Sequence, residues 1–431
     1  MTELRNQVQA LEEKLIEYRR DFHNHPEPGW TEFRTASKII HLLKEWGYSI
    51  RYGADVVAES AMMGVPSEDV LNTKMEQAIA QGADPELLKG MAGGKTGIVA
   101  ELYCGEGPII AIRYDMDSND IQEAQEEEHR PYREGFASKN AGAMHACGHD
   151  GHMSMGLGAA ELLASMKDQL HGTIRFIFQP GEEGVRGARA MVEAGVVDDV
   201  DYIIGGHIGF KAAHTGDVIC ATGKFLATTK IDAEFTGVPA HAGAAPQEGK
   251  NALLAAATAA LNLHAISRHG EGASRINVGV LHAGQGRNIL PPNAVIKLET
   301  RGETSGIDQY MVNEAKRMIQ AAAAMYDVKC DMQMVGGTSG GQSDLEVAKV
   351  LKAEAEKIPY FTNIIEYADF GAAEDYAHMM STVQAHGGKG TYYMIGADRA
   401  AGHHDNHFDF DETALAAGVE LVVRSVLQIA R

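Results

Sequence analysis

The sequence contains few cysteines and no long apolar run. Four cysteines in 431 residues cannot form a disulfide framework, which argues against a disulfide-stabilised secreted scaffold. No apolar stretch approaches the roughly 20 residues that a membrane-spanning helix needs. The first 25 residues form a charged helical pattern without the apolar centre of a secretory signal. We therefore expect no membrane insertion and predict a cytoplasmic protein.

Positive charge is also scarce. The chain has 38 Lys and Arg against 59 Asp and Glu, and its formal net charge is −21. This balance argues against nucleic acid and against an anionic membrane surface as partners. It does not exclude an anionic small molecule, which would need a local positive site.

The length and the element pattern predict two domains, because 431 residues are too many for one ordinary core. From residue 108 to about 218, buried runs alternate with helical stretches, which is typical of an α/β fold with a mostly parallel sheet covered by helices on both faces. The pattern then changes to strand, helix, strand, strand, helix, strand. These six elements are expected at Thr228–Thr236, Asn251–Ser267, Arg275–Leu281, Ala294–Thr300, Asp308–Met325 and Val328–Val335.

That order is typical of a ferredoxin-like α+β domain. We predict that it is inserted at 226–336 into a larger domain made of residues 1–225 and 337–431. The small residues of Ala221–Gly223 and Gly336–Gly341 are the expected hinges.

Metal-binding side chains follow the runs that are predicted to be buried strands. They are Asp115 and Asp117, Glu182 and Glu183, His207, and His403 and His404, and a further group, Cys147, His149 and His152, begins an Ala/Gly-rich helical stretch. In an open α/β sheet the loops after the strands meet at one edge, where ligands bind. The sequence therefore predicts one site that gathers Cys, His, Asp and Glu side chains, as a two-metal hydrolase requires.

The residue types fit metal-assisted hydrolysis. A bound metal lowers the pKa of its water toward about 7. Glu182 and Glu183 place two carboxylates on one loop, so that one can bind metal while the other acts as general base and passes the proton to a leaving amine. Cys147 and His149 can face the same site, and a thiolate between two cations would be deprotonated.

Simpler interpretations remain open at this point. The two glutamates could form an exposed acidic loop, and Cys147 could be a small buried core residue. Cys147 could also be a catalytic thiol with His149 as its base. A single nucleophile explains neither the paired carboxylates nor the distant His207.

Seven motifs carry a resemblance to a known family, and they extend over nearly the whole chain. The sequence resembles the dinuclear metallopeptidases that include carboxypeptidase G, aminoacylase and the hippurate and auxin-conjugate amidohydrolases. The C-G-H-D form is similar to the amidohydrolase branch, in which a cysteine replaces a bridging aspartate. The motifs are R-Y-D-M-D (113–117), M-H-A-C-G-H-D-G-H (144–152), F-Q-P-G-E-E-G (178–184), G-H-I-G (206–209), A-H-A-G (240–243), R-N-I-L-P-P (287–292) and H-H-D-N-H-F-D-F-D-E (403–412).

The resemblance implies two divalent metal ions, Mn²⁺ or Zn²⁺, and a role for each candidate residue. Glu182 would be the general base, Asp117 would orient a metal ligand, and Asp115 would not bind metal directly. The implied metal ligands are Cys147 as the bridge, with His149, Glu183, His207 and His404 as the terminal ligands.

Further roles are implied for the inserted domain, which would act as a lid and a homodimer contact. His241 would stabilise the oxyanion, in its own or a partner's site. Asn288 and Arg301 would hold the substrate carboxylate, which suits the bidentate guanidinium, although Arg301 could also be an ordinary lid arginine. Carboxypeptidase G has one more carboxylate-binding arginine after the last lid strand, where this chain has only G-G-T-S-G-G at Gly336–Gly341.

A closer resemblance is to a bacterial subfamily that cleaves p-aminobenzoyl-glutamate and works with a related second subunit. It is carried by H-R-P-Y-R-E-G-F-A-S (129–138), the 186–202 segment and the insertion at Ser67–Met91. The implied reaction is hydrolysis of an N-acyl amino acid, p-aminobenzoyl-glutamate first of all. The alternatives are a benzoyl or indole-acetyl amino acid, or a subunit that is active only with its partner.

Overall fold

The computed structural model describes residues 2–430, which form two compact units. The first unit contains the residues up to Gly223, Gln342–Phe370 and the residues from Asp375 onward. The second contains Lys224–Gly341 and Gly371–Glu374. It thus begins at 224 instead of the predicted 226, ends at 341 instead of 336, and takes in one short later segment. The extra residues after 336 complete the last strand of the second unit, which runs to Thr338.

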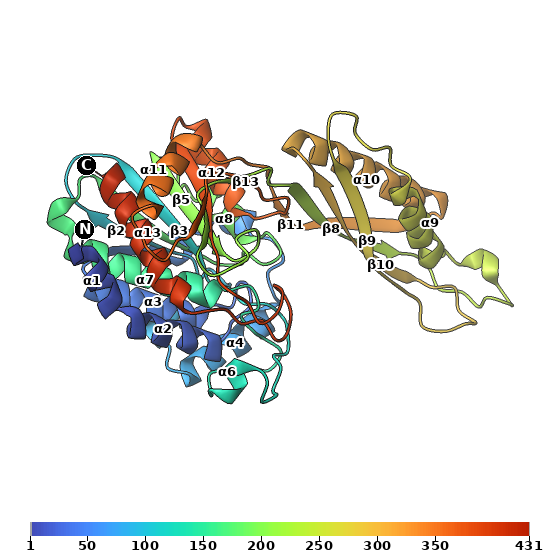
Figure 1. Cartoon of the computed structure of the whole chain (residues 1–431). Coiled ribbons are helices and arrows are strands. Elements are labelled where there is room, and N and C mark those ends of the chain that lie inside the picture. The colour runs from blue at the N-terminus through green and yellow to red at the C-terminus, as the bar shows by residue number, and fades with distance from the viewer. Residues whose placement is uncertain (1, 431) are drawn as a thin grey trace. The chain divides into compact units, whose positions relative to one another are not determined.

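The first unit is built on an eight-stranded mixed sheet (Figure 1). The central neighbours β4, β3, β5 and β14 run parallel, whereas β1 and β2 on one side and β6 on the other are joined to the sheet by antiparallel pairs. In spatial order the strands are β1 (Ser49–Tyr52), β2 (Ile98–Tyr103), β4 (Thr173–Gln179), β3 (Ile109–Asp115), β5 (Tyr202–Ile208), β14 (Lys389–Ile395), β6 (Asp217–Ile219) and β12 (Asn363–Ile365). A two-stranded pair, β7 (Thr222–Gly223) and β13 (Ala368–Asp369), lies outside this sheet.

Helices cover both faces of the sheet. Gly205 of β5 lies under the ring of Tyr376, while Ile208 of the same strand lies against Gly151. Since side chains alternate along a strand, positions 205 and 208 face opposite sides. The helices of this unit are α1 (Thr2–Ala10), α2 (Glu12–Asn24), α3 (Phe33–Glu45), α4 (Glu68–Ala80), α5 (Pro85–Lys89), α6 (Arg130–Arg133), α7 (His149–Ser165), α8 (Gly187–Glu193), α11 (Leu345–Ala355), α12 (Tyr376–Ala385) and α13 (Thr413–Ile429).

This cover explains why the central strands are nearly continuous apolar runs. β3, β4, β5 and β14 each begin with one partly buried residue and are buried over the rest of their length. Strands of a parallel sheet are buried on both faces, so apolar residues dominate them and do not alternate with polar ones. The predicted α/β fold class is confirmed. Among the described residues, no helix combines the length and the apolar character that a membrane crossing needs.

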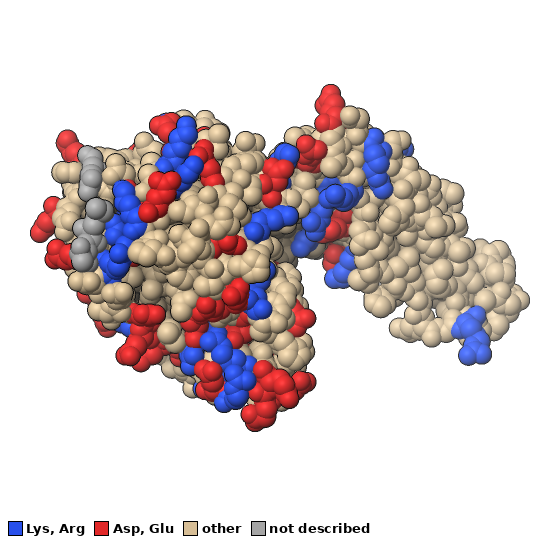
Figure 2. Space-filling view, in the orientation of Figure 1, with Lys and Arg blue, Asp and Glu red and all other residues tan. Residues whose placement is uncertain are grey.

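The second unit is a four-stranded antiparallel sheet with two helices (Figure 1). The sheet order β11-β8-β10-β9 is that of a ferredoxin-like fold, as predicted. Ile231 and Phe235 of the sheet share an apolar core with Met311 and Ile319 of a covering helix. The elements are β8 (Ala227–Thr236), α9 (Ala252–His264), β9 (Ser274–Ala283), β10 (Asn293–Gly302), α10 (Ser305–Met325) and β11 (Lys329–Thr338). On the face seen in Figure 2, a large part of this unit carries no charged side chain.

Candidate metal centre

Cys147 and His149 enter the site from the start of α7. Gly148 between them has φ 95°, a left-handed conformation that glycine adopts without strain, and it lets the chain turn into the helix. Sγ of Cys147 lies 3.5 Å from Nε2 of His207, at the end of β5. One ligand atom from each of Cys147, His149 and His207 lies within 4.8 Å of the others, and all three residues are buried.

A second group of possible ligands shares the same cysteine. Ligand atoms of Cys147, Glu183 and His404 also lie within 4.8 Å of one another. Nε2 of His404 is 3.2 Å from a carboxylate oxygen of Glu183. His404 has φ 64°, an uncommon conformation for a residue with a side chain. The structure therefore brings all five predicted ligands together in the first unit, as two groups of three that meet at Cys147.

The hydrogen bonds of His149 leave one ring nitrogen suited to a cation. Nδ1 lies 2.7 Å from the backbone carbonyl oxygen of Asp117, which can only accept, so Nδ1 carries the hydrogen. Nε2 is buried and has no hydrogen-bond partner. Buried polar atoms are rarely left unpaired. Burial would lower the pKa of His149, but the Asp115 carboxylate, 3.8 Å from Nε2, and the contacts with Asp117 and Cys147 raise it well above its usual value. A metal ion bound at Nε2 would therefore take the place of a proton.

His207 presents its ring in the same way. Nδ1 lies 2.7 Å from the carbonyl oxygen of Ile208, which leaves Nε2 facing Cys147. Burial, together with the charges of His152 and His403 when they are protonated, lowers the pKa of His207 well below its usual value. The ring is therefore neutral, as metal binding requires.

The environment of Cys147 does not favour a free thiolate nucleophile. Burial raises the pKa of this thiol well above its usual value, and the Glu183 carboxylate acts in the same direction. A reactive thiolate needs a positive environment that lowers its pKa. Bound cations would supply it, because a coordinated thiol loses its proton. The chemistry of this donor set thus fits metal binding better than thiol catalysis.

Two buried carboxylates fix the turn that carries Glu182 and Glu183. The backbone N–H of Glu182 donates to one oxygen of Asp117 at 2.9 Å, and that of Glu183 donates to the other at 2.8 Å. The N–H of Gly181 donates to Glu32 at 2.8 Å. Three successive N–H groups are thereby satisfied, and the Glu182 carboxylate is left 4.0 Å from Nε2 of His149. Sequence reasoning missed Glu32, which no motif singled out.

Glu183 differs from an ordinary carboxyl group in its acidity. Burial alone would raise the pKa of Glu183, but the contact with His404 and the charges of His149 and His404 lower it to about 2. The side chain is therefore ionised over the whole physiological pH range, which suits a cation ligand.

His152 is excluded as a ligand by its own hydrogen bonds. Nε2 accepts from the N–H of Ile208 at 2.9 Å, and Nδ1 donates to Asp115 at 2.6 Å. Asp115 also accepts from Arg113 at 2.7 Å. Burial would raise the pKa of Asp115, but His149, His152 and Arg113 lower it well below its usual value. Asp115 and His152 thus hold each other in place beside His149, together with Arg113 and the backbone of Ile208.

His403, the neighbour of His404, has a different position. Its Nε2 accepts from the N–H of Phe210 at 3.2 Å, and its ring stacks on Phe210 with centroids 4.2 Å apart. This interaction uses the lone pair that a metal would need, and the structure therefore separates two adjacent histidines that share one motif.

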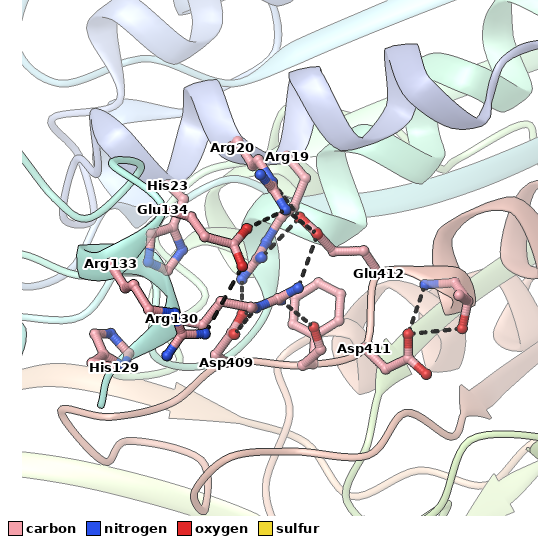
Figure 3. A network of polar contacts seen from close by, with 12 residues as sticks. Arg19, Arg20, His23, His129, Arg130, Arg133, Glu134, Asp409, Asp411 and Glu412 are labelled. Carbon is pink, nitrogen blue, oxygen red and sulfur yellow. Dashed lines mark hydrogen bonds and ion pairs between the residues drawn. The ribbon is translucent and has the colours of Figure 1, made fainter. Parts of the chain in front are cut away.

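A buried ion network, the Arg19 network, holds the ligand-bearing segments in place (Figure 3). Arg19 of α2 donates to Asp150 at 2.9 Å, to Asp409 at 2.8 Å and to Glu412 at 3.0 Å. Arg130 of α6 contacts the last two carboxylates as well. Asp150 follows His149 directly, and Asp409 and Glu412 lie in the segment after His404. Sequence reasoning did not find this network, because its members are far apart in the chain.

The remaining predicted residues belong to the second unit. His241 is exposed, and its Nδ1 accepts from the N–H groups of Gly243 and Ala244 at 3.2 and 3.1 Å, so Nε2 carries the hydrogen. Asn288 is exposed too, and its backbone carbonyl oxygen accepts from the N–H of Ala242 at 3.0 Å. His241 and Asn288 therefore lie in one paired loop region.

Arg301 lies apart from that loop, on strand β10. Its Nε donates to the Glu299 carboxylate at 2.9 Å. A substrate carboxylate would have to share this guanidinium with Glu299.

Comparisons with known proteins identify a family and similar sequences. Residues 111–428 match the family described as peptidase family M20/M25/M40. The chain is 49% identical to one subunit of p-aminobenzoyl-glutamate hydrolase from Escherichia coli (strain K12), over 99% of this chain and 98% of that protein. It is 47% identical to indole-3-acetyl-aspartic acid hydrolase of Enterobacter agglomerans, over 98% of each.

Two crystal structures share the fold. The aminobenzoyl-glutamate utilization protein from Klebsiella pneumoniae has a TM-score of 0.84 at 40% identity, covering 98% of this chain and 97% of that one. The YXEP protein of Bacillus subtilis, described as a dinuclear metal-binding peptidase from the M20 family, has a TM-score of 0.68 at 25% identity, covering 98% and 99%.

Proposed function

Because the chain belongs to the peptidase family M20/M25/M40, we propose that it is a metal-dependent amidohydrolase that cleaves p-aminobenzoyl-glutamate to p-aminobenzoate and glutamate. The observation that carries the proposal is the pair of ligand groups that meet at Cys147, with the Glu182 carboxylate beside them. The 49% identity to a hydrolase of that name over 99% of the chain supports the substrate.

The two groups suggest how a pair of divalent ions would be held. Cys147 would bridge them, His149 and His207 would bind one ion, and Glu183 and His404 would bind the other. When bound, such ions lower the pKa of a coordinated water toward about 7 and polarise the substrate carbonyl. Thiolate and imidazole ligands favour zinc, while carboxylate also suits manganese, so both remain candidates.

Glu182 would act as the general base. Its backbone is fixed by Asp117, and its carboxylate lies 4.0 Å from the His149 ring without belonging to either group that contains Cys147. The carboxylate would take a proton from the attacking water and deliver it to the amine of the leaving amino acid. Asp117 would hold Glu182, Glu183 and His149 at fixed positions relative to one another, because it forms hydrogen bonds with all three residues.

Residues of the second unit would complete the reaction. The Nε2–H of His241 is a donor on an exposed ring, and we propose that it stabilises the oxyanion. Asn288 and Arg301 would hold the substrate carboxylate, with Glu299 released from Arg301 in the process.

Two kinds of protein partner are proposed, a second copy of this chain bound through the second unit and a related second subunit. β9 is an edge strand of the sheet, and an apolar groove of about 420 Å³ lined by Pro239, Ile289 and Pro291 lies at its end. Edge strands offer unpaired backbone groups to another chain. The Escherichia coli relative is named as one subunit of its hydrolase, which supports a related partner chain. A cytoplasmic location remains a prediction from the sequence.

A second candidate substrate is an indole-acetyl amino acid, because the chain is 47% identical to a hydrolase named for indole-3-acetyl-aspartic acid. The names of both relatives describe an aromatic acyl group on an acidic amino acid. The proposed substrate class is therefore an aryl-acyl acidic amino acid, whichever acyl group is preferred.

The test is turnover by the purified chain after metal removal and reloading with manganese or zinc. Metal-dependent release of glutamate from p-aminobenzoyl-glutamate is the expected result. Turnover of indole-3-acetyl-aspartate alone would favour the second candidate. No turnover of either, with two ions bound per chain, would require the related partner chain, and failure with that partner present would contradict the proposal.

A further inference from the structure

Arg399 follows strand β14 and lies against the backbone beside His207. A Cβ built on Gly209 would collide with Nη1 of Arg399, so the guanidinium rests directly on this glycine, whose φ is 87°. Nη1 is also 3.3 Å from Nε2 of His403. A side chain at position 209 would displace the arginine, and the glycine therefore makes room for it.

The His403 ring separates Arg399 from the candidate metal ligand His207. The His403 ring lies 5.3 Å from the His207 ring, measured between centroids. His207 in turn faces Cys147 at 3.5 Å. A partly exposed guanidinium thus lies beside the proposed metal centre, separated from Cys147 by two neighbouring histidine rings.

Arg399 differs from the buried arginines near the site, Arg19 and Arg113, in its charge balance. Arg19 contacts three carboxylates, and Arg113 contacts Asp115 and Asp375. Among the described residues, no carboxylate oxygen lies close enough to the Arg399 guanidinium, within 4.0 Å, to form an ion pair.

Neighbouring Asp398 does not change this balance. It is exposed and faces His214 and the Thr215 N–H. Burial lowers the pKa of Arg399 below its usual value, with only partial compensation from the charge of Asp398. Placing a cation in a partly buried position without a counter-ion costs free energy, which a bound anion would recover.

The residues predicted to bind substrate supply a cation for only one carboxylate. The Gly336–Gly341 segment contains no basic residue. Arg301 of the second unit is already paired with Glu299. An acidic amino acid has two carboxylates, and Asn288 with Arg301 accounts for one of them.

We propose that Arg399 binds the side-chain carboxylate of the acidic amino acid in the substrate. This assignment rests on the proposed function, and it names the residue that would make the enzyme prefer an acidic amino acid. Nη1 is engaged by His403, and the other N–H groups of the guanidinium have no partner among the described residues. A guanidinium can hold a carboxylate with two parallel hydrogen bonds.

The test compares two substrates that differ only in this carboxylate, p-aminobenzoyl-glutamate and p-aminobenzoyl-glutamine. Arg399→Gln should lower kcat/KM for the glutamate compound by roughly 10- to 100-fold, the worth of a hydrogen bond to a charged group. The value for the glutamine compound should stay within about twofold. An equal loss on both substrates, or no loss on either, overturns the proposal.

Two further variants separate recognition from general effects. Lys211→Gln removes the same charge from an exposed side chain two residues after Gly209, and it should leave the substrate ratio unchanged. Arg399→Lys keeps the charge and should retain part of the preference for glutamate. The two substrates are compared by the ratio of their kcat/KM values. If Lys211→Gln shifts this ratio as much as Arg399→Gln does, the preference for glutamate comes from the positive charge of the surface in general and not from Arg399.

A binding measurement makes the outcome independent of turnover. Titration calorimetry on metal-loaded Glu182→Gln protein should give weaker binding of p-aminobenzoyl-glutamate, and not of the glutamine compound, when Arg399→Gln is added. If the loaded chain without the Arg399 change binds neither compound, even with the related partner chain present, the proposed function fails together with this inference. If it binds both and Arg399→Gln changes neither affinity, only the inference fails.

Discussion

The candidate metal centre in the first unit and the predicted substrate residues in the second unit are held in very different ways. Around Cys147, the ligands are mostly buried, and buried carboxylates bind the backbone that carries Glu182 and Glu183. His241 and Asn288 are exposed and lie on a loop region. A preorganised centre orients charge before the substrate arrives, whereas exposed residues become ordered by the contact they make. We therefore predict that substitutions around Cys147 change metal binding, whereas substitutions of His241 and Asn288 leave it unchanged.

Replacing Glu182 should remove catalytic activity from the candidate metal centre without changing its structure. Glu182→Gln is expected to lower kcat by about 10²–10⁴, the usual contribution of a general base, with the metal content unchanged. Metal analysis and steady-state kinetics on the same sample would check this. Glu183→Gln is the matched control and should lose metal instead. Metal loss from Glu182→Gln would reverse the proposed roles of these neighbours.

Replacing Arg19 should test how far the first region depends on its ion network. Burial would lower the pKa of Arg19, but Asp150, Asp409 and Glu412 raise it, so the side chain is charged. Arg19→Met leaves their buried carboxylates without this cation and should destabilise the metal-free protein by about 3–5 kcal/mol. Urea unfolding measures the change.

The second unit supplies the contrasting control. The Arg317–Glu314 pair there is solvent-exposed, and such pairs contribute little. Arg317→Met should therefore leave the urea midpoint unchanged. Similar effects of the two substitutions would show that the network is not what stabilises the first unit.

His241→Ala addresses the second region. The exposed ring is the proposed oxyanion donor, and removal of one such donor typically costs about 10²–10³ in kcat. Because the side chain is exposed, the thermal midpoint and the metal content should be preserved. A variant with normal kcat would remove His241 from the mechanism, and one with a lowered midpoint would give it a structural role.

The smallest effect is expected at Arg301. Since Glu299 already neutralises this side chain, Arg301→Ala should raise KM for p-aminobenzoyl-glutamate by only about tenfold, with kcat nearly constant. Glu299→Gln, which frees the guanidinium, should lower KM. If both substitutions leave KM unchanged, the substrate carboxylate is bound elsewhere.

The strands and the clustering of ligands were predictable because they depend on local patterns. β3, β4 and β5 are buried apolar runs, and Glu183 and His207 stand where these runs end. The structure supplied what depends on hydrogen-bond partners. His149 and His152 share one motif, but only the structure shows that Ile208 occupies Nε2 of His152 while the same atom of His149 is unpaired.

Long-range partners were beyond sequence reasoning for another reason. Glu32 contacts the Gly181 N–H, 149 residues away, and no periodic pattern connects two such positions. The same applies to Arg399, whose proposed role depends on a glycine in a different strand-end loop and on the absence, among the described residues, of a carboxylate that pairs with it.

The Arg19 network also has a consequence for synthesis of the chain. Arg19 lies 390 residues before Asp409 and 393 before Glu412. At the ribosomal rate of roughly 5–20 residues per second, about 20–80 s pass between the emergence of the arginine and that of these partners. Arg19 of helix α2 therefore cannot make these contacts until Asp409 and Glu412 have emerged, and a nascent chain must keep this segment hydrated or shielded by a chaperone during that interval.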